Sequence, residues 1–179
     1  MQTQNDFVHV IESLIKDLEE KGFNPVMVGG MALALMGSQR VTFDCDFLIS
    51  LQDLLAETII EVFYKHGFEL VSKLNERREV IRTIDNPRIA AVRLKLDEPP
   101  SAFFYNYNIK FKIDLLFDFP LPAKEIASRS VKIKARAHHL RIASIEDLIR
   151  LKEIAYADRK LSTDLQDLEF LRNYRKKSK

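Results

Sequence analysis

The sequence predicts an α/β (α+β) fold, in which a mixed β-sheet is flanked by helices and followed by further helices at the C-terminus. Segments with strand character alternate with segments of helical periodicity, which is typical of helices laid over a sheet. Residues Val26 to Leu48 contain a strand, a glycine turn, a short helix and a second strand. We therefore expect residues 1–140 to form a sheet-containing core and residues 141–179 to form a helical extension packed on it.

Composition places the chain among ordinary globular proteins. Its 179 residues suffice for one domain with a real core, and its 46% hydrophobic and 30% charged residues are unexceptional. No apolar run is long enough to span a bilayer and the first residues lack a signal-peptide pattern, so we expect a cytoplasmic protein without a membrane partner. Cys45, the single cysteine, is expected to be a small core residue. The net charge of +2 neither requires nor excludes an anionic partner.

The first elements follow from periodicity and from turn residues. Residues 5–21 form an amphipathic pattern that Asn5 or Asp6 can cap and Gly22 can end. Residues 23–28 predict a strand, and residues 31–36 a short helix after the glycine turn. The second strand is expected to end with its aspartates. Ser50–Asp53 is similar to a capping box and predicts a helix that Gly67 ends.

The middle of the chain is predicted mostly as strands. Residues 68–71, 79–84 and 89–96 have strand character, with a helix as the alternative for the last of them. Residues 103–107 are expected to be an aromatic loop that covers the core, with stacking on a nucleobase as the alternative. In residues 109–117 the apolar residues Phe111, Ile113, Leu115 and Phe117 fall on one face and Lys110, Lys112 and Asp114 on the other, which predicts a strand with one buried face.

The last part is predicted to be a hairpin followed by two helices. Residues 124–141 are rich in lysine and arginine, which favours an exposed hairpin over a nucleic-acid-binding stripe. Ser144 begins a capping box and predicts the first helix. A second helix is expected over residues 163–174, and the basic tail from Arg172 onward is expected to fray.

Two carboxylates stand on one face of the second strand. Side chains alternate along a strand, so Asp44 and Asp46 point the same way while Cys45 points to the other face. Two like charges this close repel unless a cation lies between them, and carboxylate oxygens suit Mg²⁺. Gly29 and Gly30 leave free backbone N–H groups at the start of a helix, where a phosphate is favoured. The segment thus predicts a phosphate and metal site.

These motifs resemble the nucleotidyltransferase superfamily, which has a polymerase-beta-like fold. The resemblance rests on Val28-Gly29-Gly30, on Asp44-Cys45-Asp46-Phe47 and on Asp114 within a later strand. Residues 37–42 and 144–152 are similar to the small bacterial AbiEii-like group. The resemblance implies transfer of a nucleoside monophosphate from an NTP to a hydroxyl acceptor, with release of pyrophosphate. It also implies a toxin–antitoxin component, with a cognate antitoxin as a partner.

The resemblance further implies roles for individual residues. Asp44, Asp46 and Asp114 would hold two Mg²⁺ ions, which Mn²⁺ could replace, and Asp114 would help to activate the acceptor. Gly29 and Gly30 would bind the triphosphate; the family often has serine at the second position, so here the backbone acts alone. Arg40 and Lys152 are further nucleotide-binding candidates.

The sequence leaves alternatives open for the roles of individual residues, for the function and for the acceptor. Lys152 can equally be a solvated helix lysine. Asp164 and Asp167 lie three residues apart and are expected to pair with a nearby basic residue (Arg159, Lys160 or Arg172) rather than with a metal. The main alternative function is a catalytically silent binding module, such as an antitoxin or scaffold. A two-metal phosphoesterase and a plain structural domain explain the motifs less well. The acceptor can be RNA, protein or a small molecule.

Overall fold

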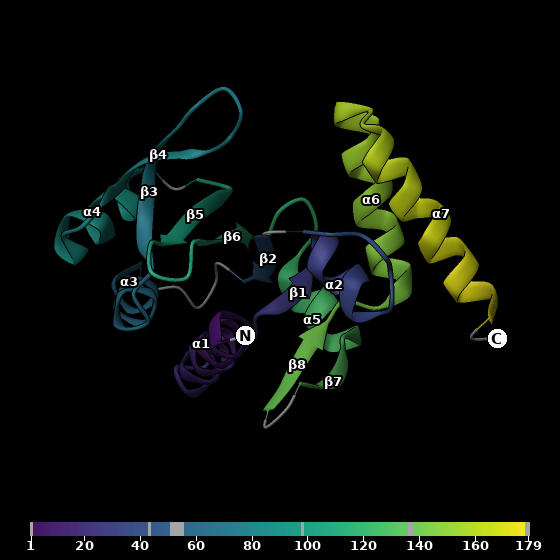
Figure 1. Ribbon diagram of the computed structural model, residues 1–179, viewed down its shortest axis with the longest axis horizontal. Helices are drawn as coiled ribbons and strands as arrows, with labels where there is room; N and C mark the ends of the chain where they lie inside the picture. Colours follow the sequence, from purple (N-terminus) through teal and green to yellow (C-terminus); the bar gives the residue numbers. More distant parts are fainter. Residues whose placement is uncertain (1, 43, 51–55, 98, 136–137, 178–179) are drawn as a thin grey trace.

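A computed structural model describes residues 2–42, 44–50, 56–97, 99–135 and 138–177 (Figure 1). Its helices and strands alternate along much of the chain, as the sequence predicts. In chain order the elements are α1 (Gln2–Glu20), β1 (Val26–Val28), α2 (Gly29–Leu35), β2 (Asp44–Ile49), α3 (Ala56–Lys65), β3 (Glu69–Leu74), β4 (Val80–Ile84), α4 (Pro87–Asp97), β5 (Ser101–Asn106), β6 (Phe111–Phe117), α5 (Ala123–Arg129), β7 (Val131–Ala135), β8 (His138–Ile142), α6 (Ile145–Arg159) and α7 (Ser162–Lys177).

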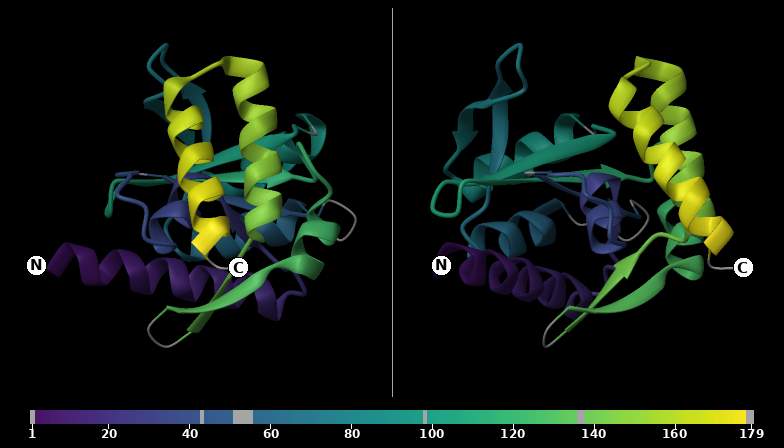
Figure 2. Two further views of the ribbon diagram at one scale, coloured as in Figure 1. Left: turned by 90° about the vertical axis from the view of Figure 1, so that its right-hand side faces the viewer. Right: turned by 45° about the vertical axis from the view of Figure 1, so that its right-hand side comes forward.

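The strands form one mixed sheet of eight strands in the order β4-β3-β5-β6-β2-β1-β8-β7. The central strands β2 and β6 are parallel, and β1 runs antiparallel to β2 on its other side. Helices α1 and α3 lie next to each other on one face of the sheet, and α6 and α7 form a hairpin at the end of the molecule away from α3 and α4 (Figures 1 and 2). The predicted α/β class is confirmed.

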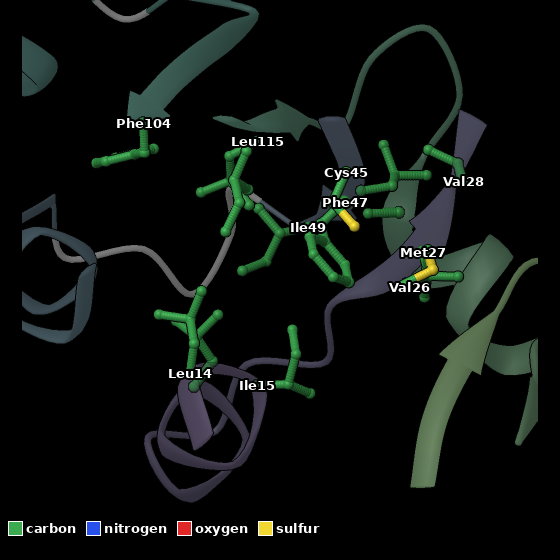
Figure 3. Packing of buried hydrophobic residues seen from close by; sticks show 14 of the residues in the cluster. Leu14, Ile15, Val26, Met27, Val28, Cys45, Phe47, Ile49, Phe104 and Leu115 are labelled. Atoms are coloured by element: carbon green, nitrogen blue, oxygen red, sulfur yellow. The ribbon is translucent and has the colours of Figure 1, made fainter. Parts of the chain in front are cut away.

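The core lies between the sheet and helices α1 and α3. In β6 every second side chain is buried, and the alternation continues in β2 with Cys45 and Phe47. Leu14 and Ile15 of α1 point toward this face (Figure 3). Burial raises the pKa of the Cys45 thiol, so this residue is a core side chain as predicted and not a nucleophile. The opposite face of β2 and β6 carries their polar side chains.

Two predictions for the middle of the chain are wrong. The predicted strand over residues 89–96 is helix α4, because the Asn86 side chain accepts hydrogen bonds from the backbone N–H groups of Arg88 and Ile89 and Pro87 occupies the first helical position. The predicted aromatic loop is strand β5. Its buried residues alternate with Phe103 and Tyr105, which lie half-buried on the same face as the polar side chains of β6.

Boundaries also differ from the prediction. Strand β2 begins rather than ends with Asp44 and Asp46, and α1 begins at Gln2 before the predicted caps. Helix α5 takes up the first part of the basic segment, and the predicted hairpin forms from β7 and β8. Helix α7 continues to Lys177, so the prediction that the chain frays from Arg172 onward is wrong for residues 172–177. The capping box predicted at Ser50–Asp53 extends beyond the described residues.

The C-terminal helices begin with a confirmed cap and contact the core at a specific place. The Ser144 side chain accepts a hydrogen bond from the backbone N–H of Asp147 at the start of α6. Helix α7 contacts α2, the helix that follows the glycine turn. The division at residue 140 stays a prediction. Of the helices in the described part of the chain, none has both the length and the apolar character that crossing a membrane requires.

Candidate active site

The parallel pairing of β2 and β6 brings the predicted carboxylates together. In this register Asp46 lies opposite Asp114, and Asp44 lies opposite Lys112. Paired residues on neighbouring strands project to the same face, about 5 Å apart. Asp114 therefore lies next to the Asp44 and Asp46 pair although nearly seventy positions separate them in the sequence.

Burial and mutual repulsion make two of these acids hard to ionise. Burial, followed by the charge of Asp44, raises the pKa of Asp46 from 3.8 to about 6. Burial, followed by the charge of Asp46, raises the pKa of Asp114 to about 7. One carboxylate oxygen of Asp114, Oδ1, is buried and has no hydrogen-bond partner among the described residues. Burying a hydrogen-bond acceptor without a donor costs folding free energy. A proton on this oxygen, or a cation bound to it, would remove that cost.

The donor chemistry of these residues, rather than their present side-chain positions, suits a hard divalent cation. Carboxylate oxygens are the ligands that Mg²⁺ prefers, and a cation would satisfy the unpartnered oxygen of Asp114 and offset the repulsion between the acids. Asp44 accepts a hydrogen bond of 2.6 Å from the Thr42 hydroxyl and lies 3.6 Å from the Lys112 ammonium. As the side chains of the described residues lie, no three His, Cys, Asp or Glu are close enough together to hold a metal ion.

The glycine turn lies directly against Asp46. Because β1 is antiparallel to β2 and Val28 pairs with Asp46, the turn after β1 meets the beginning of β2. Gly29 has a φ of 66°, and a Cβ on this residue would lie 1.8 Å from Asp46 Oδ2. Only glycine is compatible with both conditions. The preceding Val28 offers no side-chain cap, so the first backbone N–H groups of α2 are left for another acceptor.

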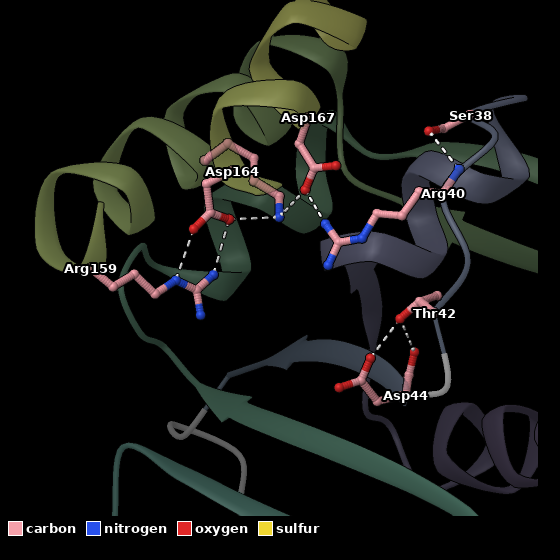
Figure 4. A network of polar contacts seen from close by, with 8 residues as sticks. Ser38, Arg40, Thr42, Asp44, Arg159, Asp164 and Asp167 are labelled. Atoms are coloured by element: carbon pink, nitrogen blue, oxygen red, sulfur yellow. Dashed lines mark hydrogen bonds and ion pairs between the residues drawn. The ribbon is translucent and has the colours of Figure 1, made fainter. Parts of the chain in front are cut away.

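A network of ion pairs connects Arg40, which follows α2, with helices α6 and α7 (Figure 4). The Asp167 carboxylate binds the Arg40 guanidinium and, at 2.6 Å, the Lys152 ammonium. Asp164 accepts from Lys152 at 3.2 Å and from two nitrogens of Arg159 at 3.0 and 3.1 Å. Lys152 is only 6% exposed, so its interpretation as a solvated helix lysine is wrong. The predicted pairing of Asp164 with Arg159 is confirmed.

This network places cations around Asp46. Lys152, Lys112 and Arg40 each lower the pKa of Asp46, which offsets part of the increase that burial causes. A Cβ on Gly30 would lie 3.1 Å from Nε and Cζ of Arg40, so the arginine packs against the turn itself. The positive charges and the turn thus both lie beside Asp46.

Sequence reasoning missed two contributions to this site. Thr42 donates to Asp44, and its position two residues before that aspartate is a signal for a shared strand face. Asp167 holds Arg40 and Lys152 together, which spacing alone does not reveal because Arg40 is distant in the sequence.

The raised pKa values predict an unusual dependence of stability on pH. Between pH 3.8 and about 7 the folded protein binds more protons at Asp46 and Asp114 than the unfolded chain does. The free energy of unfolding should therefore fall as pH rises through this range. We expect a lower Tm at pH 7.5 than at pH 5 in the presence of EDTA, measured by differential scanning fluorimetry, and recovery with Mg²⁺ at pH 7.5. An unchanged pH slope in the Asp46→Asn/Asp114→Asn double variant would contradict this.

A known protein family matches most of the chain. A family model described as "Nucleotidyl transferase AbiEii toxin, Type IV TA system" matches residues 11–178. No curated protein sequence matches the chain.

Solved structures share the fold at low sequence identity. The chain is similar to the solution structure of the antibiotic-resistance factor ANT(2'')-Ia, with 12% identity and a TM-score of 0.59 over 96% of this chain and 84% of that one. A crystal structure of ANT(2'')-Ia in complex with adenylyl-2''-tobramycin has 11% sequence identity and a TM-score of 0.57, and the match covers 92% of this chain and 86% of that one. The crystal structure of a putative nucleotidyltransferase from Thermotoga maritima has 11% sequence identity and a TM-score of 0.58, and the match covers 92% of this chain and 94% of that one. At such low identities, the TM-scores show likeness of fold alone.

Proposed function

The chain belongs to the nucleotidyltransferase family of AbiEii toxins of type IV toxin–antitoxin systems, and on that premise we propose that it is a magnesium-dependent enzyme that moves a nucleoside monophosphate from an NTP to a hydroxyl acceptor. The observation that carries this proposal is the register of β2 and β6, which sets Asp114 opposite Asp46, beside Gly29. A domain without catalysis has no need of two buried acids that repel each other.

The glycine turn and its neighbouring cations bind the triphosphate. Backbone N–H groups of Gly29 and Gly30 donate to phosphate oxygens, and the absence of side chains lets the phosphates approach. Arg40 and Lys152 supply positive charge next to the turn, and Asp167 holds both in place. These residues act by orienting the nucleotide, which is most of what phosphoryl-group transfer requires.

The carboxylates serve the reacting α-phosphate. Asp44, Asp46 and Asp114 would hold two divalent cations, which when bound neutralise the charge that develops on the phosphate oxygens. The acceptor oxygen forms a bond to the α-phosphorus, the bond from that phosphorus to the bridging oxygen breaks, and pyrophosphate leaves with the electron pair. Asp114 accepts the proton of the acceptor hydroxyl. A carboxylate within hydrogen-bond reach of the acceptor hydroxyl can act as the general base.

Substitution of Lys152 can distinguish a role in NTP binding from a role in the stability of the fold. In Lys152→Met the charge is lost but most of the volume is kept, so the KM for NTP should rise about tenfold or more. Two buried carboxylates lose a partner, and the free energy of unfolding should fall by about 3 kcal/mol. Adding Asp167→Asn should recover stability but not the KM, as measured by chemical denaturation and steady-state kinetics. If the double variant recovers both, Lys152 has only a structural role.

The proposed reaction is tested by following label from each α-³²P-labelled NTP with Mg²⁺ into RNA, protein and small-molecule acceptors. Label should enter one class of acceptor and pyrophosphate should appear in equal amount. Label released only as free nucleotide would indicate a phosphoesterase instead. Absence of both products with every NTP would favour a catalytically silent binding module.

Family membership also suggests a toxin role, with a cognate antitoxin as partner. If the transfer reaction is the toxic activity, expression of the wild-type chain should arrest bacterial growth. The Asp44→Asn variant should be produced at the same level without arresting growth. Arrest by both proteins would separate toxicity from transfer.

A further inference from the structure

A cavity of about 550 Å³ opens beside Asp44, on the side of β2 where β6 and β5 lie. Its lining includes Thr42 and Asp44 before and at the start of β2, Tyr105 of β5, Lys112 of β6, and Arg78 and Glu79 at the turn between β3 and β4. The Glu79 carboxylate accepts a hydrogen bond of 2.6 Å from the Asn75 side chain. The volume is that of a small-ligand site. The glycine turn follows β1, on the other side of β2. The cavity and the proposed triphosphate site therefore flank the carboxylates from opposite sides.

Arg78 is held over this cavity by a structured turn. The Asn75 side chain accepts hydrogen bonds from the backbone N–H groups of Arg77 and Glu79 at 2.9 and 2.8 Å. Arg78 itself has a φ of 61°, a conformation that costs a residue other than glycine free energy and is often kept for function. The sequence thus tolerates backbone strain at the position whose side chain reaches the cavity.

The Arg78 guanidinium and the Lys112 ammonium face the same aromatic ring. They lie 5.7 Å and 5.1 Å from the centre of Phe103, the residue of β5 that pairs with Asp114. Within the described part of the chain, no carboxylate oxygen lies within ion-pair distance of Arg78, whereas Lys112 has Asp44. An arginine without an acidic partner, at the wall of a cavity, is suited to bind an anion.

The chemistry of transfer assigns a role to each side of the carboxylates. The attacking oxygen and the leaving pyrophosphate lie roughly in line on opposite sides of the α-phosphorus. If pyrophosphate departs at Gly29 and Gly30, the acceptor must approach from the side of β6 and β5, where the cavity lies.

We propose that this cavity is the acceptor subsite and that Arg78 selects an acceptor with a phosphate group close to the hydroxyl that is attacked. The direction of attack rests on the proposed function. Binding of an anion by Arg78 does not depend on that function. Arg78 binds the phosphate in a bidentate manner, and the half-buried Tyr105, which lines the cavity, offers an aromatic surface for a planar group attached to it.

Two kinds of acceptor share this chemistry, a free mononucleotide and the end of a nucleic-acid strand. The probes are therefore AMP, the dinucleotide ApA, and adenosine, which has hydroxyl groups but no phosphate. Binding of each to the full-length protein is measured by isothermal titration calorimetry, and transfer is measured from labelled NTP. We expect AMP or ApA to bind at least about tenfold more tightly than adenosine, and the tighter of the two identifies the kind of acceptor.

Variants of one turn provide matched controls. Arg78→Ala keeps the Cβ and hence the backbone strain, and should weaken binding of the phosphate-bearing probe by about tenfold or more while leaving NTP affinity unchanged. Arg77→Ala removes the same charge from the neighbouring exposed residue, which does not line the cavity, and should change affinity less than twofold. The affinity of Arg78→Lys for the phosphate-bearing probe should lie between those of Arg78→Ala and Arg77→Ala, because lysine keeps the charge but not the bidentate geometry.

Three results would overturn the proposal: adenosine binding as tightly as ApA and AMP, equal losses in Arg77→Ala and Arg78→Ala, or an equal loss of NTP affinity in Arg78→Ala. Binding of ApA or AMP that depends on Arg78 without any label transfer would support the anion site and refute the transferase. Transfer of label that is insensitive to Arg78→Ala would support the transferase and refute the subsite.

Discussion

The Asp114→Asn variant is expected to bind NTP and to fold, but to transfer nucleotide at least about 1,000-fold more slowly than the wild type. Asparagine has nearly the shape of aspartate, so the packing of β6 is preserved. It can neither take the proton of the acceptor nor contribute charge to a cation site. Single-turnover transfer from labelled NTP measures the loss directly, because it does not depend on product release.

Stability provides an independent readout for the same variant. Asp114 is buried beside Asp46 and its Oδ1 has no partner among the described residues, so replacing it should raise the Tm in EDTA at pH 7.5 by roughly 2–4 °C. Asp85→Asn, the same substitution at an exposed position, should change neither the rate nor the Tm. An Asp114→Asn variant that keeps more than about a tenth of the wild-type rate would show that Asp114 is not the base.

Gly29→Ala is expected to damage the site as severely, through geometry rather than charge. A Cβ would lie 1.8 Å from Asp46 Oδ2, and the backbone φ of 66° disfavours alanine even without that contact. The carboxylate has to move away from the turn. We expect transfer to fall at least about 100-fold and the free energy of unfolding to fall by about 3 kcal/mol.

Gly37 provides a matched control for this substitution. It also has a positive φ, of 94°, but a Cβ there would meet nothing within 4 Å. Gly37→Ala should therefore cost only the backbone term, about 1–2 kcal/mol, and leave transfer intact. Chemical denaturation and transfer assays on both variants separate the two effects. Equal losses of activity at both positions would show that contact with Asp46 is not what requires glycine at position 29.

Much of the fold could be predicted from the sequence because it is encoded locally. The apolar residues at every second position from 111 to 117 give both the strand and its buried face, and Ser144 marks the beginning of a helix through a hydrogen bond within one turn. The error at residues 89–96 arose because a short apolar run fits either period. Asn86 and Pro87 carried the information that decides for a helix.

The sequence allowed most residues of the candidate site to be predicted, but not the contacts between residues from distant segments. Asp44 and Asp46 share a face by strand periodicity, and their convergence with Asp114 was expected from resemblance and is seen in the β2–β6 register. Contacts between distant segments have no such rule. The sequence does not show that Asp167 joins Arg40 to Lys152, because strand order and helix placement decide that contact.

The central claim is that Asp44, Asp46 and Asp114 share divalent cations with a nucleotide whose phosphates lie on the glycine turn. A crystal structure with Mn²⁺ and a non-hydrolysable NTP analogue tests it directly, because anomalous scattering locates Mn²⁺ independently of the protein. We predict anomalous peaks in contact with the three carboxylates and with the α-phosphate, and the outer phosphates at the N–H groups of Gly29 and Gly30. A bound nucleotide with Mn²⁺ away from these carboxylates would contradict the account.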